Sequence, residues 1–208
     1  MSSTRLLLVR HAQPREEARG RCHGTLDIGL SARGLRNARH LGRTLDEVGL
    51  AAIYSSPRRR ALETAAALGQ PHGLTPLIEE DLREIDFGDF EGHTYDEIAQ
   101  THPRLYRQWM ETPTQIEFPG GESYPKLRTR VLAAVDAIRH RHQGEVTAVV
   151  AHSGVIRAVV SDCLGIPNEL IFRIDQSYGA ISIIDWIDGV PIARLINGQF
   201  CGRSGART

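Results

Sequence analysis

Short apolar runs alternate with segments of helical periodicity along most of the chain. The predicted buried strands are 5–9, 51–54, 74–78 and 146–150. Helices are predicted over 31–48, from 55 through at least 68, over 95–111 with a break at Pro103, over 123–140, and up to about 163. Residues 180–187 and 191–196 flank Asp188-Gly189, which predicts a hairpin. This order predicts one α/β domain over 1–208: a three-layer αβα sandwich with a mainly parallel central sheet and an antiparallel edge strand.

Composition narrows the class of protein. The 208 residues include 41% hydrophobic residues, which is ordinary for a globular domain, and 25 basic residues balance 25 acidic ones. This balance argues against nucleic acid or an anionic membrane as a partner. Three distant cysteines, Cys22, Cys163 and Cys201, predict neither a disulfide framework nor a zinc site, so a reduced, cytoplasmic protein is expected. No segment has the length of a membrane span, and the small, polar tail 202–208 is predicted to be disordered.

Reactive side chains follow two of the predicted strands directly. Arg10-His11 follows the first strand, and His152 follows the run that begins at residue 146. Ligands of open α/β sheets bind at the carboxyl ends of the strands, so these residues are expected to share one site. An arginine offers a planar fork for phosphate, and a histidine can be a neutral nucleophile near pH 7. A single histidine after a strand is more often structural, so this pattern alone leaves the chemistry open.

Several further blocks follow in an order that makes the pattern specific. They are Arg21 with Gly24-Thr25-Leu26-Asp27-Ile28-Gly29-Leu30-Ser31, then Tyr54-Ser55-Ser56-Pro57-Arg58-Arg59-Arg60-Ala61, the acidic and aromatic stretch 82–92, Pro119-Gly120-Gly121-Glu122-Ser123, and Val150-Ala151-His152-Ser153-Gly154. With Arg10-His11 at their head, these blocks resemble the histidine phosphatase superfamily, the phosphoglycerate mutase-like enzymes. The resemblance covers about residues 6–184.

The resemblance implies a role for three residues in catalysis. His11 would be the nucleophile that forms a phosphohistidine, and His152 would donate a hydrogen bond to the phosphoryl group. Glu84 would protonate the leaving alkoxide and then activate water, and a nearby phosphate dianion favours its protonated form. Glu84 lies in an acidic stretch that would otherwise be read as a solvated surface, and the resemblance selects it.

The resemblance also implies a set of phosphate-binding residues. Arg10 and Arg58 would hold the phosphoryl oxygens, although Arg58 begins a run of three arginines that could be a solvated helix start. Arg21 is an equal candidate for a phosphate contact or for a salt bridge within its loop. Ser153 could add donors where the following helix begins. No metal and no cofactor are expected, because strong donors already stand where a magnesium ion would act.

Three positions of the first loop depart from the family pattern. Ala12 replaces the usual glycine and permits fewer backbone angles. Pro14 replaces a common hydroxyl residue and stiffens the loop. Glu17 stands where mutase-like members carry a phosphate-binding asparagine, so either the loop runs differently or that contact is absent. These departures concern substrate contacts and leave the reaction type unchanged.

Within the family, the block at 87–92 and the compact 119–123 turn resemble the phosphatase branch more than the mutases. The expected activity is therefore hydrolysis of a small phosphomonoester. The stretches 22–24, 165–167, 172–176 and 180–185 resemble those of the α-ribazole phosphatases of cobalamin biosynthesis. The alternatives are a broad-specificity sugar-phosphate phosphatase, a phosphoglycerate mutase and a non-catalytic phosphate-binding module.

Residues 93–123 are expected to form a lid, in which Tyr95, Trp109 and Phe118 either stack on an aromatic base or form the lid core. A homodimer is compatible with the sequence, but no particular residues indicate one.

Overall fold

The computed structural model describes residues 3–200, so Cys201 and the tail 202–208 lie outside the described residues. Six strands form one sheet in the order β3-β2-β4-β1-β5-β6. They are β1 Ser3–Arg10, β2 Leu50–Ser55, β3 Leu77–Ile78, β4 Val146–Ala151, β5 Ile181–Ile187 and β6 Val190–Gly198. β1, β2, β3 and β4 pair in parallel, β5 pairs antiparallel with β1, and β6 pairs antiparallel with β5.

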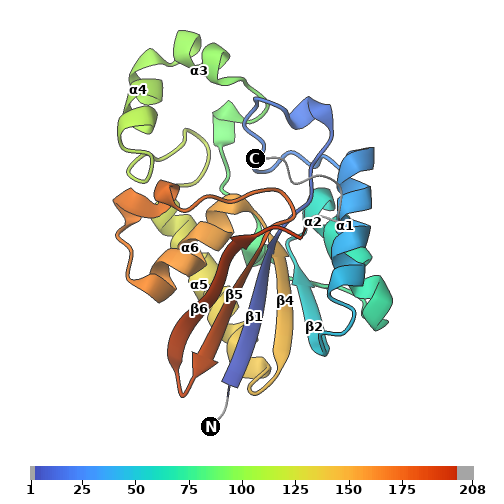
Figure 1. The fold of residues 1–208 in the computed structure, drawn as a ribbon. Helices are drawn as coiled ribbons and strands as arrows, with labels where there is room; N and C mark the ends of the chain where they lie inside the picture. The colour runs from blue at the N-terminus through green and yellow to red at the C-terminus, as the bar shows by residue number, and fades with distance from the viewer. Residues whose placement is uncertain (1–2, 201–208) are drawn as a thin grey trace, which may run out of the picture.

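Helices cover both faces of this sheet (Figure 1). The α-helices are α1 Ala32–Thr44, α2 Arg59–Gly69, α3 Tyr95–Thr101, α4 Pro103–Glu111, α5 Tyr124–Arg141 and α6 Ser153–Leu164. The short 3-10 helices are η1 Glu16–Ala18, η2 Gln70–His72, η3 Glu80–Leu82, η4 Gly88–Phe90 and η5 Asn168–Arg173. α1 and α2 lie on one face, and α5 and α6 lie on the other. The predicted three-layer αβα sandwich is therefore confirmed. Within residues 3–200, no helix combines the length and the apolar character that a membrane span requires.

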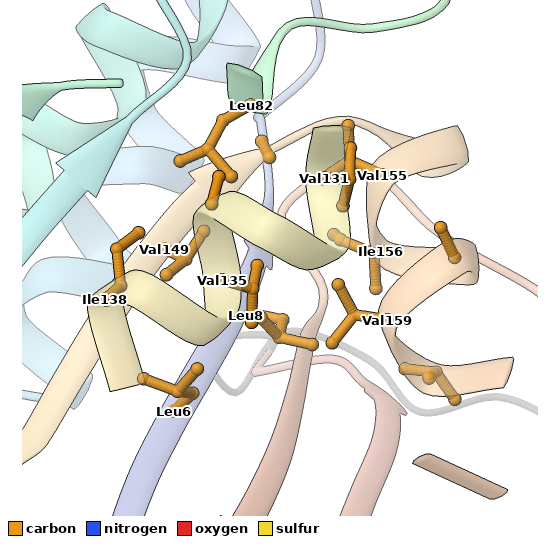
Figure 2. Packing of buried hydrophobic residues seen from close by; sticks show 14 of the residues in the cluster. Leu6, Leu8, Leu82, Val131, Val135, Ile138, Val149, Val155, Ile156 and Val159 are labelled. Atoms are coloured by element: carbon orange, nitrogen blue, oxygen red, sulfur yellow. The ribbon is translucent and has the colours of Figure 1, made fainter. Parts of the chain in front are cut away.

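The central strand β1 supplies side chains to both layers of the core. Leu8 packs with Val135 of α5 and Val159 of α6, as Figure 2 shows. Leu7 and Val9 point to the opposite face, where they join the cluster beneath α1 and α2. Successive side chains of a strand alternate between faces, so a strand covered on both sides must be apolar throughout. This burial holds β1 rigidly and determines where its carboxyl end delivers Arg10 and His11.

Most predicted elements are present, with shifts at their ends. Ser31 caps α1 as predicted by accepting the Gly34 N–H, but the helix ends at Thr44 instead of residue 48. The expected strand 74–78 is reduced to two residues, and Ser123 precedes α5 without a side-chain cap hydrogen bond. The hairpin is confirmed, and its antiparallel strand β5 lies one place in from the edge that β6 forms.

The segment 93–123 carries α3 and α4 and lies beyond the carboxyl ends of the parallel strands (Figure 1). It has a small apolar core of its own, in which Trp109 and Phe118 are buried with Phe90. Tyr95 is 43% exposed and stacks on Trp109 with a centroid distance of 5.2 Å. Trp109 and Phe118 therefore belong to the core of this segment, and Tyr95 is the partly exposed aromatic residue beside it.

Candidate active site

Two histidines meet where β1 and β4 end. The parallel register pairs Arg10 with Ala151, so His11 and His152 leave the sheet side by side. Their ring centroids are 5.1 Å apart and the rings are inclined by 62°. Both side chains are almost completely buried. The structure therefore brings together the two histidines that the sequence pattern singled out.

His11 is held with one nitrogen free for chemistry. Its Nδ1 lies 2.8 Å from the carbonyl oxygen of Ala12, and only an Nδ1–H can donate to that acceptor. Nε2 then carries the lone pair. Burial is the main cause that moves the pKa of His11 well below 6.5, and the positive charges of Arg60 and Arg10 lower it further. At neutral pH the ring is thus neutral and nucleophilic at Nε2.

His152 is oriented from the opposite side. Its Nε2 lies 2.7 Å from Oγ of Ser56, a buried residue that follows β2. Its Nδ1 is buried and has no hydrogen-bond partner among residues 3–200. Burial, followed by the charge of Arg60, moves the pKa of His152 well below 6.5.

These buried neutral histidines are expected to make the protein less stable in mild acid. The unfolded chain protonates each imidazole near pH 6.5, whereas the depressed pKa keeps the folded one neutral to lower pH. The unfolded state thus binds more protons below pH 6.5. Each histidine then removes about 1.4 kcal/mol of unfolding free energy per pH unit until its folded pKa is reached. Urea denaturation between about pH 7.5 and 5.5 measures this slope. His11→Gln should reduce the slope of unfolding free energy against pH, whereas His140→Gln, at an exposed position, should leave it unchanged. Equal slopes in the native protein and both variants would contradict the conclusion that a buried neutral His11 causes the pH dependence.

Arg10 directly precedes His11 and keeps a buried donor without a partner in the part of the chain that the structure describes. Its guanidinium carbon is 4.0 Å from the centroid of the Tyr178 ring, and one Nη donates to the Gln176 carbonyl. Burial lowers the pKa of Arg10, with a partial offset from charges that include Glu84. Within the described residues its buried Nε has no partner.

A second arginine at the site is Arg60, which our sequence analysis did not select. Its side chain is 0% exposed, and its two Nη atoms donate to the carbonyls of Leu26, His23 and Gly24. Burial lowers the pKa of Arg60 to about 10, yet it is the largest charge acting on both catalytic-site histidines. Its Nε has no partner within residues 3–200. Arg60 is therefore a further candidate, beside Arg58, for the arginine that holds the phosphoryl oxygens.

Arg58 lies at the very start of α2, whereas Arg60 lies within the helix. Arg58 is the N-cap residue of α2 and is half-buried, and its backbone N–H donates to Ser56 Oγ. Like that of Arg60, its buried Nε has no partner within residues 3–200. Its charge lowers the pKa of Arg60 but is not among the main influences on His11. Arg60 lies one helical turn before Thr64, a buried polar residue whose hydroxyl accepts the Ala12 N–H. That pairing of polar residues four apart on an inward face was the available signal for Arg60.

Glu84 closes the site at the N-terminus of α6. Its carboxylate accepts the N–H groups of Ile85 at 2.9 Å and Gly154 at 3.0 Å, and the Ser153 hydroxyl at 3.2 Å. A Cβ at Gly154 would lie 2.3 Å from Glu84 Oε1, so only glycine permits this approach. The helix that begins just after His152 therefore also positions the carboxyl group.

The remaining candidates divide between the site and its surroundings. Ser153 reaches the site through its bond to Glu84. Arg21 instead donates to the Gly92 carbonyl at 2.7 Å and lies 3.6 Å from Glu97, which is the loop salt bridge weighed above. The Arg21 guanidinium is therefore bonded within its own surroundings, and a phosphate contact by this residue stays a prediction.

The first loop accommodates the unusual residues. Ala12 is buried. Among the described residues other than glycine, a positive φ occurs at Asp188 and Asn197, so Ala12 has an ordinary backbone conformation and the absence of glycine causes no strain. Glu17 is exposed on η1. Its carboxylate therefore does not need to face the phosphate.

Two cavities flank Tyr95. The first, of about 500 Å³, is lined by Glu84, Ser153 and Gly154 together with a mostly apolar set: Ile85, Phe87, Tyr95, Trp109, Met110, Pro113, Phe118, Tyr124, Leu127, Arg157, Ile171 and Phe172. The second, of about 610 Å³, is rich in arginine and lies against Tyr178, whose ring contacts His11. Its lining includes Arg15, Arg19, Arg21, Arg33 and His23. Within residues 3–200, no group of three or more His, Cys, Asp or Glu side chains is placed to hold a metal ion.

An α/β sandwich with buried histidines and arginines at its strand ends defines a site for an anionic group. Comparison with known families matches residues 6–199 to the histidine phosphatase superfamily (branch 1), and the chain belongs to this family. It is a phosphomonoester hydrolase of that family.

Several known proteins similar to this chain carry phosphatase names. Phosphoserine phosphatase 1 of Hydrogenobacter thermophilus is 36% identical over 180 residues, which are 86% of this chain and 85% of the relative. The solved structure of Bacillus stearothermophilus YhfR has a TM-score of 0.88 at 32% identity, covering 95% of this chain and 98% of that one. The α-ribazole phosphatase from Shigella flexneri has a TM-score of 0.87 at 25% identity, covering 97% and 100%.

Proposed function

We propose that this protein hydrolyses a small phosphomonoester through a phosphohistidine formed on His11. The observation that carries the proposal is a set of buried side-chain nitrogens near the strand ends that have no partner in residues 3–200, among them Arg10 Nε, Arg58 Nε, Arg60 Nε and His152 Nδ1. Buried donors of this kind are costly unless something accepts from them. A phosphoryl group beside His11 supplies acceptor oxygens, and the positive charges offset its own charge.

The reaction divides into two balanced steps. First, the lone pair of His11 Nε2 attacks phosphorus, the bond from phosphorus to the ester oxygen breaks, and protonated Glu84 gives its proton to the departing oxygen. Second, Glu84 takes a proton from water, whose oxygen attacks phosphorus. The bond from phosphorus to nitrogen then breaks, which releases phosphate and restores the His11 lone pair. Arg10, Arg60 and His152 hold the non-bridging oxygens throughout, so no metal is needed.

The leaving group occupies the apolar cavity in this proposal. Glu84 lines that cavity, and the ester oxygen must lie beside Glu84 to receive its proton. Aromatic and aliphatic walls such as Phe87 and Phe172 favour an alcohol with a flat apolar part over a small polar one. α-Ribazole 5'-phosphate has such a part, and a similar solved structure bears the name of an α-ribazole phosphatase. We therefore propose it as the first candidate substrate, with residues 93–123 acting as the lid.

The arginine-rich cavity favours a second candidate. Its cationic lining, including Arg15 and Arg33, suits an alcohol that carries a carboxylate or another phosphate. Phosphoserine and 3-phosphoglycerate have this character, and a relative bears the name phosphoserine phosphatase. A broad-specificity sugar-phosphate phosphatase would gain little binding energy from either cavity. A phosphoglycerate mutase would transfer the phosphoryl group from His11 to another hydroxyl group instead of to water.

A substrate panel separates these candidates. Release of inorganic phosphate is measured from α-ribazole 5'-phosphate, phosphoserine, glucose 6-phosphate and 3-phosphoglycerate, the last with and without 2,3-bisphosphoglycerate, and always with EDTA. We expect the highest kcat/KM with α-ribazole 5'-phosphate. Isomerisation of 3-phosphoglycerate without phosphate release would instead indicate a mutase, and loss of all turnover in EDTA would contradict the metal-free mechanism.

Two variants assign the cavities within the same panel. Phe172→Ala should raise KM for α-ribazole 5'-phosphate about tenfold and leave phosphoserine unchanged, since one large apolar contact is lost. Val190→Ala, an exposed residue on β6, is its control. Arg33→Gln should raise KM for phosphoserine if the second cavity binds the carboxylate, and Arg36→Gln on the same helix is the matched control.

A further inference from the structure

Ser56 contacts the second histidine from behind the phosphoryl site. It follows β2, is 0% exposed, and its Oγ lies 2.7 Å from His152 Nε2. Its backbone is held in place by the bond from its N–H to the Val150 carbonyl. Neither the expected catalytic set nor the phosphate-binding set includes it.

The position of one proton on His152 decides what this histidine can do. The depressed pKa leaves the ring neutral, so it carries a single N–H. With the proton on Nε2, the ring would donate to Ser56 and present a lone pair to the phosphoryl oxygens, which are themselves acceptors. With the proton on Nδ1, the ring would accept from Ser56 and donate toward the site. Nδ1 is the buried nitrogen without a partner in residues 3–200.

We propose that Ser56 is a positioning residue that holds His152 as its Nδ1–H tautomer, ready to donate to the transferring phosphoryl group. The hydroxyl gives its hydrogen to Nε2 and accepts the Arg58 N–H, which lies 3.3 Å away, so both sides of Oγ are used. The charges that face the imidazole are Arg60 and Arg10, with His11 and His23 beside them, and they oppose a second proton on the ring. This inference rests on the proposed function for its catalytic meaning, but the tautomer exists without substrate.

The tautomer is measured directly by ¹⁵N–¹H NMR of the protein labelled at histidine, with His152 assigned through His152→Gln. We expect an Nδ1–H signal in the native protein, and a shift toward Nε2–H in Ser56→Ala, because the bond that orders the proton is gone. Ser56→Thr keeps the hydroxyl and should keep the native signal. An Nε2–H signal in the native protein, or an unchanged tautomer in Ser56→Ala, would overturn the proposal.

Steady-state kinetics provide a second test of the role of Ser56. Ser56→Ala should lower kcat between about tenfold and 100-fold with little change in KM, because a donor to the developing charge is misdirected. Ser55→Ala is the matched control, since Ser55 is equally buried but its hydroxyl donates to the Ser56 carbonyl. Equal kcat in Ser56→Ala and the native protein would overturn the role of Ser56. If the native protein shows the Nδ1–H tautomer but hydrolyses no phosphomonoester, the proposed function fails while the tautomer assignment stands.

Discussion

His11→Ala is expected to lower kcat/KM for any phosphomonoester by about 10⁴-fold or more, since it removes the atom that bonds to phosphorus. Nδ1 of His11 is fixed by the Ala12 carbonyl, which leaves Nε2 as the attacking atom. The neighbouring His152 is not placed to replace it, because Nε2 of His152 already lies against Ser56 Oγ. The remaining arginines would still bind phosphate in this variant.

Two measurements check this expectation. Hydrolysis of p-nitrophenyl phosphate is compared between His11→Ala and His140→Ala, an exposed histidine at the end of α5 that should have no effect. Rapid quenching with a radiolabelled substrate should trap an acid-labile phosphoryl group on the native protein and none on His11→Ala. Full activity of His11→Ala would remove this residue from the mechanism. Phosphate binding without any turnover in the native protein would favour the non-catalytic module.

Arg60→Ala is expected to lower kcat/KM about 10³-fold and to reduce the free energy of unfolding by about 3 kcal/mol. The catalytic loss follows from removing a fixed charge beside both histidines. The stability loss follows from the three carbonyls of Leu26, His23 and Gly24, which would be left without their donor. Few single arginines combine both effects, because most guanidinium groups lie at the surface.

The three consecutive arginines provide their own controls. Arg59→Ala should have almost no effect on activity, since its side chain is exposed and pairs with Glu63 on the surface of α2. Arg58→Ala should lower kcat/KM less than tenfold. Assays well below the unfolding midpoint, with circular dichroism on each variant, separate catalysis from folding. A larger catalytic loss in Arg58→Ala than in Arg60→Ala would restore Arg58 as the phosphate-binding arginine.

Much of the fold and part of the site followed from the sequence because they depend on local patterns. The apolar run of β1 had to be a buried strand, and a strand in a parallel sheet presents its carboxyl end to the ligand edge. His11 and His152 therefore met as predicted, and the break between α3 and α4 fell at Pro103, where the ring removes a backbone donor. The family resemblance identified the acidic stretch that contains Glu84.

What only the tertiary structure decided were contacts between residues far apart in sequence. The sequence does not distinguish the three adjacent arginines. The packing of α2 directs Arg60 inward against the carbonyls near Gly24 and leaves Arg59 exposed. Arg21 is held by the Gly92 carbonyl and by Glu97 of α3, which lie far from it in the sequence. The bond between Ser56 and His152 joins residues 96 positions apart, and no local pattern contains it. Local periodicity determines which elements form, whereas the direction of each polar side chain depends on which segments the fold brings beside it.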